Sequence, residues 1–265
     1  MLTNTKSLFI SILKAQQADC VCDIGSRDGD QSLLFRHLLP HATVIAFEAN
    51  PINFEAMQAN QSLKDSRIEL HPWAISDRRG VATFHIADVD YSDPNANRGT
   101  SSLLTAEGAK VKKSVTVETH RIDELILSDH PDAQKIGLWI DVEGAEYAVL
   151  TGSEAISHRI IAINVETTNE GRWEGQRRFS ELQSLLRMHG FVFCGRNFGP
   201  GLTEWGDAVF IQDRIAKGMG FRLALCKFKA FASYVLRADH IAVLLKNRIP
   251  WLYRFLRRLY IRFGT

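Results

Sequence analysis

Carboxylates stand at the ends of most predicted buried strands in this 265-residue chain. These acidic residues are Asp23, Glu48, Asp141, Glu143 and Glu166. Because α/β sheets bind ligands beyond the carboxyl ends of their parallel strands, we expect these side chains to converge on one site. A carboxylate there can accept hydrogen bonds from the hydroxyls of a ribose or take a proton from a reacting group. Acids also cap helices, so the argument depends on their recurrence at strand ends.

The stretch CVCDIGSRDGDQS (20–32) interrupts a predicted strand with two glycines, Gly25 and Gly29. Glycine lets the backbone approach a ligand closely and adopts dihedral angles that are closed to other residues. The dinucleotide fingerprint G-x-G-x-x-G is absent, because Arg27 stands two residues after Gly25. The phosphate-binding loop G-x-x-x-x-G-K-[ST] is absent as well. Together with Glu48, the stretch favours a cofactor that carries a ribose and an amino acid over one that carries a pyrophosphate.

Strand-like apolar runs alternate with helical patterns through the body of the chain. Buried strands are predicted at 20–25, 42–49, 67–76, 136–144, 160–168, 191–197 and 207–212, and strands of a more exposed insertion at 81–87 and 114–120. Helices are predicted at 31–39, 50–63, 145–157 and 177–190. Repeated βα units predict a doubly wound, mostly parallel sheet that is covered on both faces. We expect an N-terminal helix at 1–19, a main domain at 20–213 and a helical extension at 214–265.

Composition and cysteine content bound the class of protein. Hydrophobic residues make up 45% of the chain, which is enough for a sizeable core. Four cysteines in a chain of this length do not form a disulfide framework, and we interpret them as buried structural thiols compatible with a reducing cytosol. No apolar run reaches the roughly 18 residues of a spanning helix. The apolar run at 8–13 is too short for the core of a signal peptide.

Five stretches, in order, resemble the FkbM-type family of S-adenosylmethionine-dependent methyltransferases. They are VCDIGSRDGDQS (21–32), VIAFEANPINFEAMQAN (44–60), AISD (74–77), GTSSLL (99–104) and WIDVEGAEYAVLTG (139–152). The resemblance covers about residues 20–211. It implies a Rossmann-like fold with a seven-stranded, mostly parallel sheet, an antiparallel last hairpin, and S-adenosyl-L-methionine as the cofactor. The chain departs from the family pattern at Trp139, where a lysine is frequent, and at 121–123, where Arg-Ile-Asp replaces Thr-Leu-Asp.

The resemblance also implies a set of site residues. The methionine portion of the cofactor would be held by Asp23, Gly25, Ser26, Gly29 and Ser32. The ribose would be bound by Glu48, with Ala49 and Asn50 beside it. The adenine would be flanked by Ala74, Ile75 and Ser76. Asp141 would lie near the sulfonium and the acceptor, and the acceptor would contact Thr100, Ser101 and Ser102 unless these residues form a flexible turn.

Methyl transfer to an alcohol needs positioning and a group that accepts the hydroxyl proton. The candidates for this base are Asp141, which we rank first, Glu166, Glu143 and His120. Glu143 could instead cap the following helix, and His120 could be a surface residue. We expect an O-methyltransferase that acts on a sugar hydroxyl of a glycan or glycolipid. The alternatives are methylation of a small-molecule natural product and a cofactor-binding scaffold that tethers a glycan-assembly complex at a membrane.

No metal ion is expected, although one alternative stays open. An oxygen-rich set formed by Asp141, Glu166 and Asn169 could hold a divalent cation at the ends of two strands. Carboxylates at strand ends serve equally well as plain bases, so the pattern alone does not require a metal.

Charge is distributed unevenly along the chain. Residues 214–265 contain 12 Lys and Arg and one acid, whereas residues 1–213 contain 20 Lys and Arg and 29 acids. A helical wheel of 251–263 places Leu and Phe on one face and Arg on the opposite face, which predicts a basic amphipathic helix. Its partner could be an anionic membrane surface, a protein or second subunit, or the acidic body of the chain itself. Nucleic acid is not expected, because large aliphatic residues accompany the basic ones. We expect a cytoplasmic protein, with attachment to the inner face of the membrane as the further hypothesis.

Overall fold

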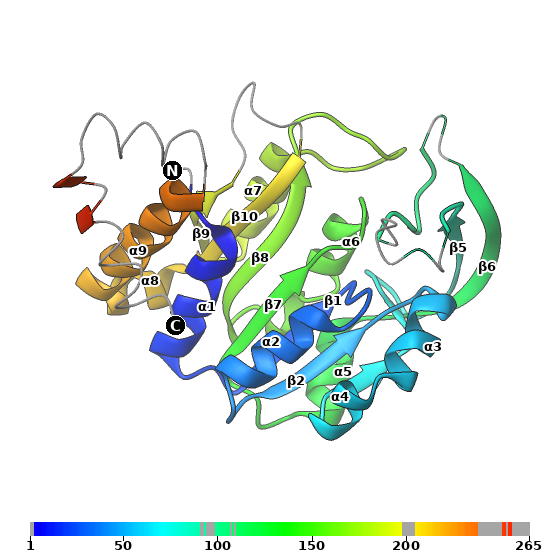
Figure 1. Ribbon diagram of the computed structural model, residues 1–265, viewed down its shortest axis with the longest axis horizontal. Coiled ribbons are helices and arrows are strands. Elements are labelled where there is room, and N and C mark those ends of the chain that lie inside the picture. Colours follow the sequence, from blue (N-terminus) through cyan, green and yellow to red (C-terminus); the bar gives the residue numbers. More distant parts are fainter. Residues whose placement is uncertain are drawn as a thin grey trace.

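The computed structural model describes residues 3–90, 93, 99–106, 108, 110–197, 205–237, 251–252 and 254–255. Seven strands form its central sheet in the order β3-β2-β1-β7-β8-β10-β9 (Figure 1). They are β1 (Cys20–Ile24), β2 (Thr43–Phe47), β3 (Glu69–His71), β7 (Ile136–Ile140), β8 (Ile160–Thr168), β9 (Phe191–Arg196) and β10 (Trp205–Gln212). β1 is parallel to both β2 and β7, whereas β10 is antiparallel to β8 and β9. The predicted mostly parallel sheet with an antiparallel last hairpin is confirmed.

The strand order reverses direction at β1, which lies between β2 and β7. The chain moves outward from β1 through β2 to β3, then crosses back to β7 on the other side. Loops that leave the carboxyl ends of β1 and β7 therefore diverge and leave room for a ligand between them. This topology places the glycine loop and the Asp141 segment next to each other.

The single strand predicted at 67–76 is wrong, because the structure contains two strands there. β3 belongs to the central sheet, whereas β4 (Ala74–Ile75) belongs to a second sheet with the order β4-β6-β5. Pro72 lies between them, and proline has no N–H to donate to a strand ladder. The second sheet is completed by β5 (Gly80–Ala87) and β6 (Val111–His120), the insertion strands that were predicted from the sequence.

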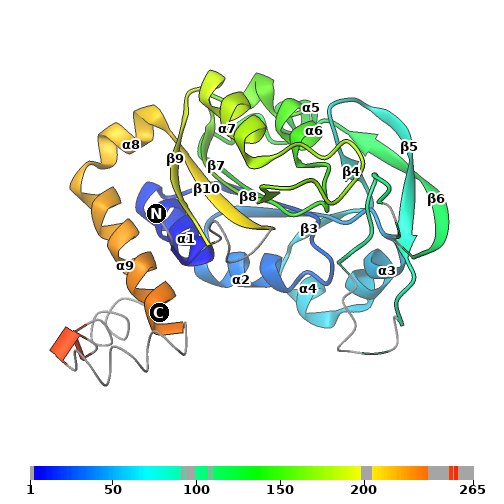
Figure 2. The ribbon, with the colours of Figure 1, turned by 90° about the horizontal axis from the view of Figure 1, so that it is seen from above.

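Helices cover both faces of the central sheet (Figure 2). The first face packs against α1 (Thr5–Gln16), α2 (Asp30–Leu38), α3 (Pro51–Ala59) and α4 (Gln61–Asp65). The second face packs against α5 (Ile122–Asp129), α6 (Glu146–Thr151), the 3-10 helix η1 (Glu154–Ile156) and α7 (Phe179–Met188). All residues of β1 and β7 are buried, as strands covered on both faces should be. The four cysteines are free and buried, in line with the sequence-based interpretation.

The chain continues after β10 into α8 (Asp213–Met219) and α9 (Phe221–Arg237). α9 packs along α1 through Leu223, Cys226 and Ala230, which are buried. The backbone N–H of Asn4 donates to the carbonyl of Ala230 at 3.1 Å, and its side-chain amide donates to the Ser233 hydroxyl at 3.1 Å. Part of the extension therefore rests on the body of the molecule. Most of the amphipathic helix predicted at 251–263 lies outside the described residues.

None of the helices among the described residues is both long enough and apolar enough to cross a membrane.

Candidate functional site

The loop that follows β1 is held against two neighbouring strand ends. The N–H groups of Gly25 and Ser26 both donate to the carbonyl of Phe47 at 3.0 Å. Gly25 has a φ of 88°, and a Cβ atom at this position would lie 1.8 Å from the carbonyl oxygen of Asp141. Glycine is therefore required here by the close approach of two backbone segments, in addition to any ligand.

Hydrogen bonds that involve Asp23, Ser26 and Ser32 hold the same loop in place. The Ser32 hydroxyl donates to the buried Asp23 carboxylate. The Ser26 hydroxyl lies 2.9 Å from the carbonyl of Asp23 and 3.1 Å from that of Phe47. Burial raises the pKa of Asp23 to about 7. Gly29 lies in the left-handed region (φ 80°) directly before α2, and its N–H donates to the carbonyl of Ser26 at 2.9 Å. Hydrogen bonds therefore connect the four predicted residues Asp23, Ser26, Gly29 and Ser32.

Glu48 ties the loop after β1 to the loop after β2. One of its carboxylate oxygens accepts the N–H of Arg27 at 2.6 Å, and the other accepts the N–H of Asn50 at 2.8 Å. Burial raises the pKa of Glu48 to about 7, although these hydrogen bonds oppose the rise. Asn50 is the N-cap of α3, since its side-chain oxygen accepts the N–H of Ile52 at 3.1 Å. The Glu48 carboxylate is thereby oriented without a cation.

A small cavity of about 60 Å³ lies beside Glu48. Its walls are mainly apolar and include Ile24, Phe47, Ala49, Ala74, Ile75, Phe84 and Leu103. A slot with apolar walls and a carboxylate at one side suits a flat ring attached to a sugar. The structure thus brings Glu48, Ala49, Ala74 and Ile75 together, as the sequence predicted.

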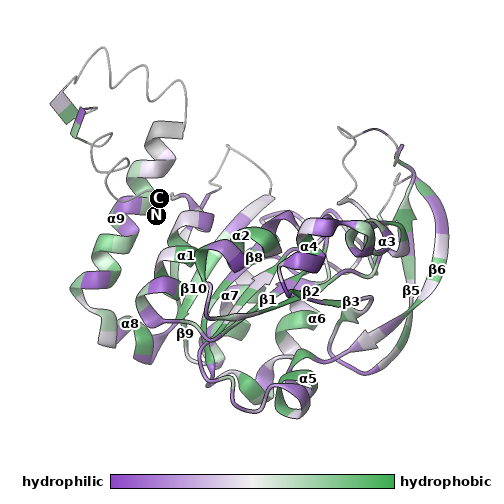
Figure 3. Cartoon of the chain, turned by 60° about the horizontal axis from the view of Figure 1, so that its bottom comes forward, coloured by the Kyte–Doolittle hydropathy of each residue, from purple (hydrophilic) through white to green (hydrophobic). Residues whose placement is uncertain are grey.

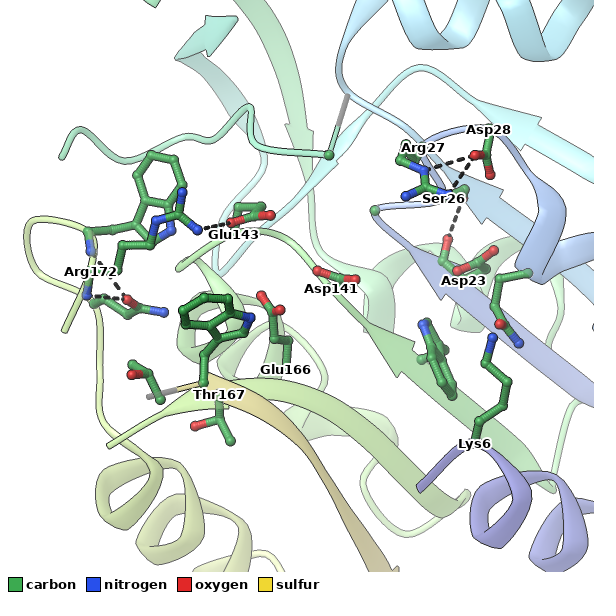
Figure 4. Close-up of a pocket in the computed structure, with 18 of the residues that line it drawn as sticks. Lys6, Asp23, Ser26, Arg27, Asp28, Asp141, Glu143, Glu166, Thr167 and Arg172 are labelled. Atoms are coloured by element: carbon green, nitrogen blue, oxygen red, sulfur yellow. Dashed lines mark hydrogen bonds and ion pairs between the residues drawn. The ribbon is translucent and has the colours of Figure 1, made fainter. Parts of the chain in front are cut away.

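A wide cavity of about 790 Å³ adjoins the small one (Figure 4). Both cavities are lined by Gly25, Arg27, Gly99, Asp141 and Glu143. The wide cavity is also lined by Lys6, Asp23, Ser26, Trp139, Glu166, Arg172, Trp173 and Trp205. Asp141 therefore lies where the two cavities meet, which is where two bound molecules would come together.

Three carboxylates gather at this junction. The side chains of Asp141, Glu143 and Glu166 each offer an oxygen, and these oxygens lie within 4.8 Å of one another. Burial, and then the charge of Asp141, raise the pKa of Glu166 to about 10. Burial raises the pKa of Asp141 to about 6, and a hydrogen bond from Glu166 opposes this rise. Of the two carboxyls, Glu166 therefore holds a proton more firmly, and Asp141 is the one that ionises first as the pH rises.

Glu143 belongs to the cavity and does not cap α6. It lies in the left-handed region (φ 53°), and burial followed by the charge of Asp141 raise its pKa to about 7. Glu146 holds the turn instead, because its carboxylate accepts the N–H of Gly144 at 2.9 Å. The Arg172 guanidinium is 4.0 Å from Glu143 on the solvent side. The sequence left both roles of Glu143 open, and the geometry favours the cavity.

The segment at 100–102 is anchored by its own hydroxyls. The Ser102 hydroxyl donates to the carbonyl of Glu143 at 2.6 Å, and the Ser101 hydroxyl accepts the side-chain amide of Asn50 at 3.2 Å. Ser101 lines the small cavity, whereas Thr100 lines a separate cavity of about 340 Å³. Ser102 is fully buried. These contacts give Ser101 and Ser102 a role in shaping the site; their contact with an acceptor stays a prediction.

Some predicted residues do not line either of the two adjoining cavities. In the described part of the chain these are Gly29, Ser32, Asn50, Ser76, Thr100, Ser102, His120 and Asn169. His120 stacks on Trp73 with ring centroids 4.0 Å apart, and its carbonyl accepts the N–H of Ser76. Asn169 is exposed, and the oxygen cluster contains Glu143 in its place.

Several cavity residues escaped prediction because no local signal marks them. Lys6 comes from α1, and Arg172 and Gln176 come from the loop after β8. Trp139 was noted only as a departure from a family pattern, yet it lines the wide cavity beneath the ammonium of Lys6, which lies 5.7 Å from its ring centroid. Only the folded chain brings these residues to the site.

Comparisons with known proteins show which family the chain resembles. The Methyltransferase FkbM domain family matches residues 23–193. The chain is 27% identical over 172 residues to the 2-O-methyltransferase NoeI of Sinorhizobium fredii, a match that covers 63% of this chain and 70% of that protein. It is 26% identical over 195 residues to the methyltransferase sdnD of Sordaria araneosa, covering 64% of this chain and 73% of that protein.

Among solved structures, the chain resembles a methyltransferase FkbM from Methylobacillus flagellatus, with a TM-score of 0.45 and 17% identity over 74% of this chain and 44% of that one. The family match spans more than half of the chain and includes all or part of every strand of the central sheet except β10. It also includes each carboxylate of the junction. The chain therefore belongs to the FkbM methyltransferase family.

Proposed function

We propose that this methyltransferase uses S-adenosyl-L-methionine and methylates a hydroxyl group of a sugar. The observation that carries the proposal is the position of Asp141 at the junction of the apolar slot and the wide polar cavity. A base in that position can reach an acceptor hydroxyl in the wide cavity next to a cofactor that enters the slot.

The residues around the slot fit the cofactor. Glu48 is buried and lines the slot, and its carboxylate accepts two backbone N–H groups and a hydrogen bond from the Asn53 side chain. A carboxylate has about four lone-pair sites, so one is left for a ribose hydroxyl. Ala74 and Ile75 supply apolar contact for an adenine, and the turn that contains Asp23, Gly25 and Ser26 borders the space for the amino-acid end.

When bound, S-adenosyl-L-methionine supplies a methyl group on a positively charged sulfur, which leaves in an in-line displacement. Asp141 is ionised at neutral pH and would accept the proton of the acceptor hydroxyl. Glu166 retains its own proton and hydrogen-bonds to Asp141, so it would hold that carboxylate in one orientation. In this arrangement Asp141 would act as the base, and Glu166 would hold it in position.

The walls of the wide cavity support a sugar acceptor. Trp205 is 54% exposed at the cavity, and Trp173 lies beside the Arg172 guanidinium at 5.5 Å from its ring centroid. The tryptophan rings can pack on the faces of a sugar ring. The carboxylates and the Gln176 amide of the cavity can form hydrogen bonds with its hydroxyls. The name of one relative specifies 2-O-methylation, which is transfer to a hydroxyl oxygen. A small-molecule acceptor is the second candidate, because the name of another relative specifies methyl transfer without an acceptor.

Titration calorimetry tests the cofactor assignment. We expect S-adenosyl-L-methionine to bind the wild-type chain, and Glu48→Gln to weaken binding by about tenfold because one charged hydrogen bond to the ribose is lost. Glu55→Gln is the matched control, because Glu55 is exposed on α3. Absence of binding, or equal binding by Glu48→Gln, would remove the assignment.

Mass spectrometry of glycans tests the acceptor. A strain without this gene should lack one methyl group on a glycan or glycolipid, and the wild-type gene should restore it whereas Asp141→Asn should not. Restoration by Asp141→Asn would point to the scaffold alternative, in which binding matters and transfer does not.

We further propose that the basic extension attaches this enzyme to an anionic membrane surface. The face of α9 that turns away from α1 carries Phe221, Leu225, Phe228 and Phe231, whose exposed fractions are 82%, 38%, 41% and 39%. Arg222, Lys227 and Lys229 flank these residues, and Figure 3 shows hydrophobic and hydrophilic residues along the helix. Helices that lie on an anionic membrane surface have this pattern: the apolar side chains insert into the interface, and the cations beside them attract the anionic lipid headgroups.

Vesicle flotation tests the attachment. The full chain should float with vesicles that contain phosphatidylserine, less with neutral phosphatidylcholine vesicles, and less again in high salt. Phe228→Ser combined with Phe231→Ser should reduce flotation while α9 keeps its contact with α1. Equal flotation of wild type and variant, or no flotation with either lipid, would overturn the membrane hypothesis in favour of a protein partner or a second subunit.

A further inference from the structure

Lys6 extends into the wide cavity from α1, which lies before the segment that matches the family. Its ammonium nitrogen is 5.7 Å from the centroid of the Trp139 ring. In Figure 4 the side chain rises from the helix on the same side of the cavity as Asp23. An element outside the matched domain therefore contributes a charged group to the site.

The helix that carries Lys6 is held firmly in place. Phe9 and Leu13 of α1 pack so closely on Gly137 of β7 that a Cβ there would lie 2.8 Å from Leu13 and 3.2 Å from Phe9. Next to Lys6, the Thr5 hydroxyl donates to the half-buried Asp207 carboxylate at 3.3 Å. These contacts set the backbone position from which Lys6 reaches the cavity.

Lys6 differs from the other two cations of the cavity in its partners. Arg27 pairs with Asp28 at 2.7 Å, and Arg172 faces Glu143 at 4.0 Å. Lys6 forms no ion pair with any residue in the described part of the chain. Its charge is nevertheless felt nearby, because it lowers the pKa of Asp23 and of Asp207 against the effect of burial. The ammonium is thus a charge available to a ligand.

We propose that Lys6 binds the α-carboxylate of the methionine portion of the cofactor. This inference rests on the proposed use of S-adenosyl-L-methionine. That portion carries an ammonium group, which suits the acids Asp23 and Asp141, and a carboxylate, which those same acids repel. Lys6 supplies the opposite charge beside Asp23, so the two ends of the zwitterion can each meet a complementary group.

Calorimetry with two ligands tests the proposal. S-adenosylhomocysteine contains the amino-acid portion, whereas 5′-deoxy-5′-methylthioadenosine contains the same nucleoside without it. Lys6→Met removes the charge but keeps an unbranched side chain, and it should weaken S-adenosylhomocysteine binding about tenfold or more, with methylthioadenosine binding unchanged. Lys6→Arg should retain most of the affinity. Lys14→Met, a change on α1 far from the cavity, is the matched control and should alter neither ligand.

Each other outcome has a distinct meaning. Equal weakening of both ligands by Lys6→Met would overturn the proposal, because the loss would be structural. Unchanged binding of both ligands would also overturn it while leaving the cofactor assignment intact. If the wild-type chain binds neither ligand, the cofactor assignment fails and this inference fails with it. Thermal unfolding of each variant confirms that the compared proteins are folded.

Discussion

At the scale of single residues, similar carboxyls receive different protonation states from their surroundings. Asp141 and Glu166 are neighbours, yet the pKa of Asp141 is about 6 and that of Glu166 is about 10. Glu166 is half-buried and faces the charge of Asp141, so it holds a proton more firmly than Asp141 and can donate it in a hydrogen bond. A site that separates two acids in this way can use one as a base and the other as its support.

Removal of the base should reduce turnover without removing the cofactor. We expect Asp141→Asn to lower kcat by about 10²–10⁴, and to change the affinity for S-adenosylhomocysteine by only a few-fold. In the wild type, kcat/KM should rise with pH through about 6 and then level off, because Asp141 must be ionised to accept a proton. Steady-state rates from pH 5 to 8 check both statements, and a rate that falls over this range would contradict the assigned role.

The same cluster allows a direct test for a metal. Without a metal requirement, dialysis against EDTA should leave the methylation rate unchanged, and added Mg²⁺ should not raise it. A loss of activity that Mg²⁺ restores would support the alternative in which Asp141, Glu143 and Glu166 hold a divalent cation.

At the scale of elements, the site depends on backbone contact between two loops. The loop after β1 and the segment after β7 meet at Gly25 and Asp141 with no room for a side chain. Glu48 then joins the loops after β1 and β2, and Ser102 joins the 99–102 segment to Glu143. Four segments far apart in the sequence are thereby held to one another around the junction of the two cavities.

Gly25→Ala should separate these loops. A Cβ at 1.8 Å from the Asp141 carbonyl must displace the backbone, so we expect a loss of several kcal/mol of stability, and at least tenfold weaker binding of S-adenosylhomocysteine. Gly175→Ala is the matched control, because Gly175 also has a positive φ (79°) but a Cβ added there would meet no atom within 4 Å. Its change should lie near 1 kcal/mol, as measured by urea unfolding, and equal losses in the two variants would contradict the steric argument.

At the scale of the whole molecule, buried acids link folding to pH. Burial raises the pKa of Asp23, Glu48 and Glu146 to about 7 in the folded chain, well above the usual values of Asp and Glu. Between about pH 4 and 7 the folded chain therefore binds protons that the unfolded chain releases. Stability from these groups is complete below the unfolded pKa and is lost as pH rises through 7.

The thermal midpoint should accordingly fall between pH 5.5 and pH 8. Glu146→Gln can still accept the Gly144 N–H but cannot ionise, so it should remove about 2 kcal/mol of the stability that the wild type loses between these two pH values. Calorimetric scans of both proteins at the two pH values provide the comparison. A fall of the same size in the variant would show that Glu146 does not contribute to it.

The sequence alone determined the central sheet and many of the residues that line the slot beside Glu48. Buried apolar runs, strand-ending acids and glycines are local patterns, and parallel topology places strand ends together whatever the details of packing. Pro72 can be read from the sequence as a residue that interrupts a strand. The assignment of β3 and β4 to two different sheets could not be predicted from it, because that depends on the presence of the second sheet.

Only the tertiary structure decided which side chains share the cavity and in which charge state. Lys6 is brought to Trp139 by the packing of α1 on β7, and Arg172 reaches Glu143 from a loop after β8. His120 stacks on Trp73, and it is not among the described residues that line the two adjoining cavities. Protonation of Glu166 depends on burial and on the distance to Asp141, and these quantities exist only once segments far apart in the sequence have folded together.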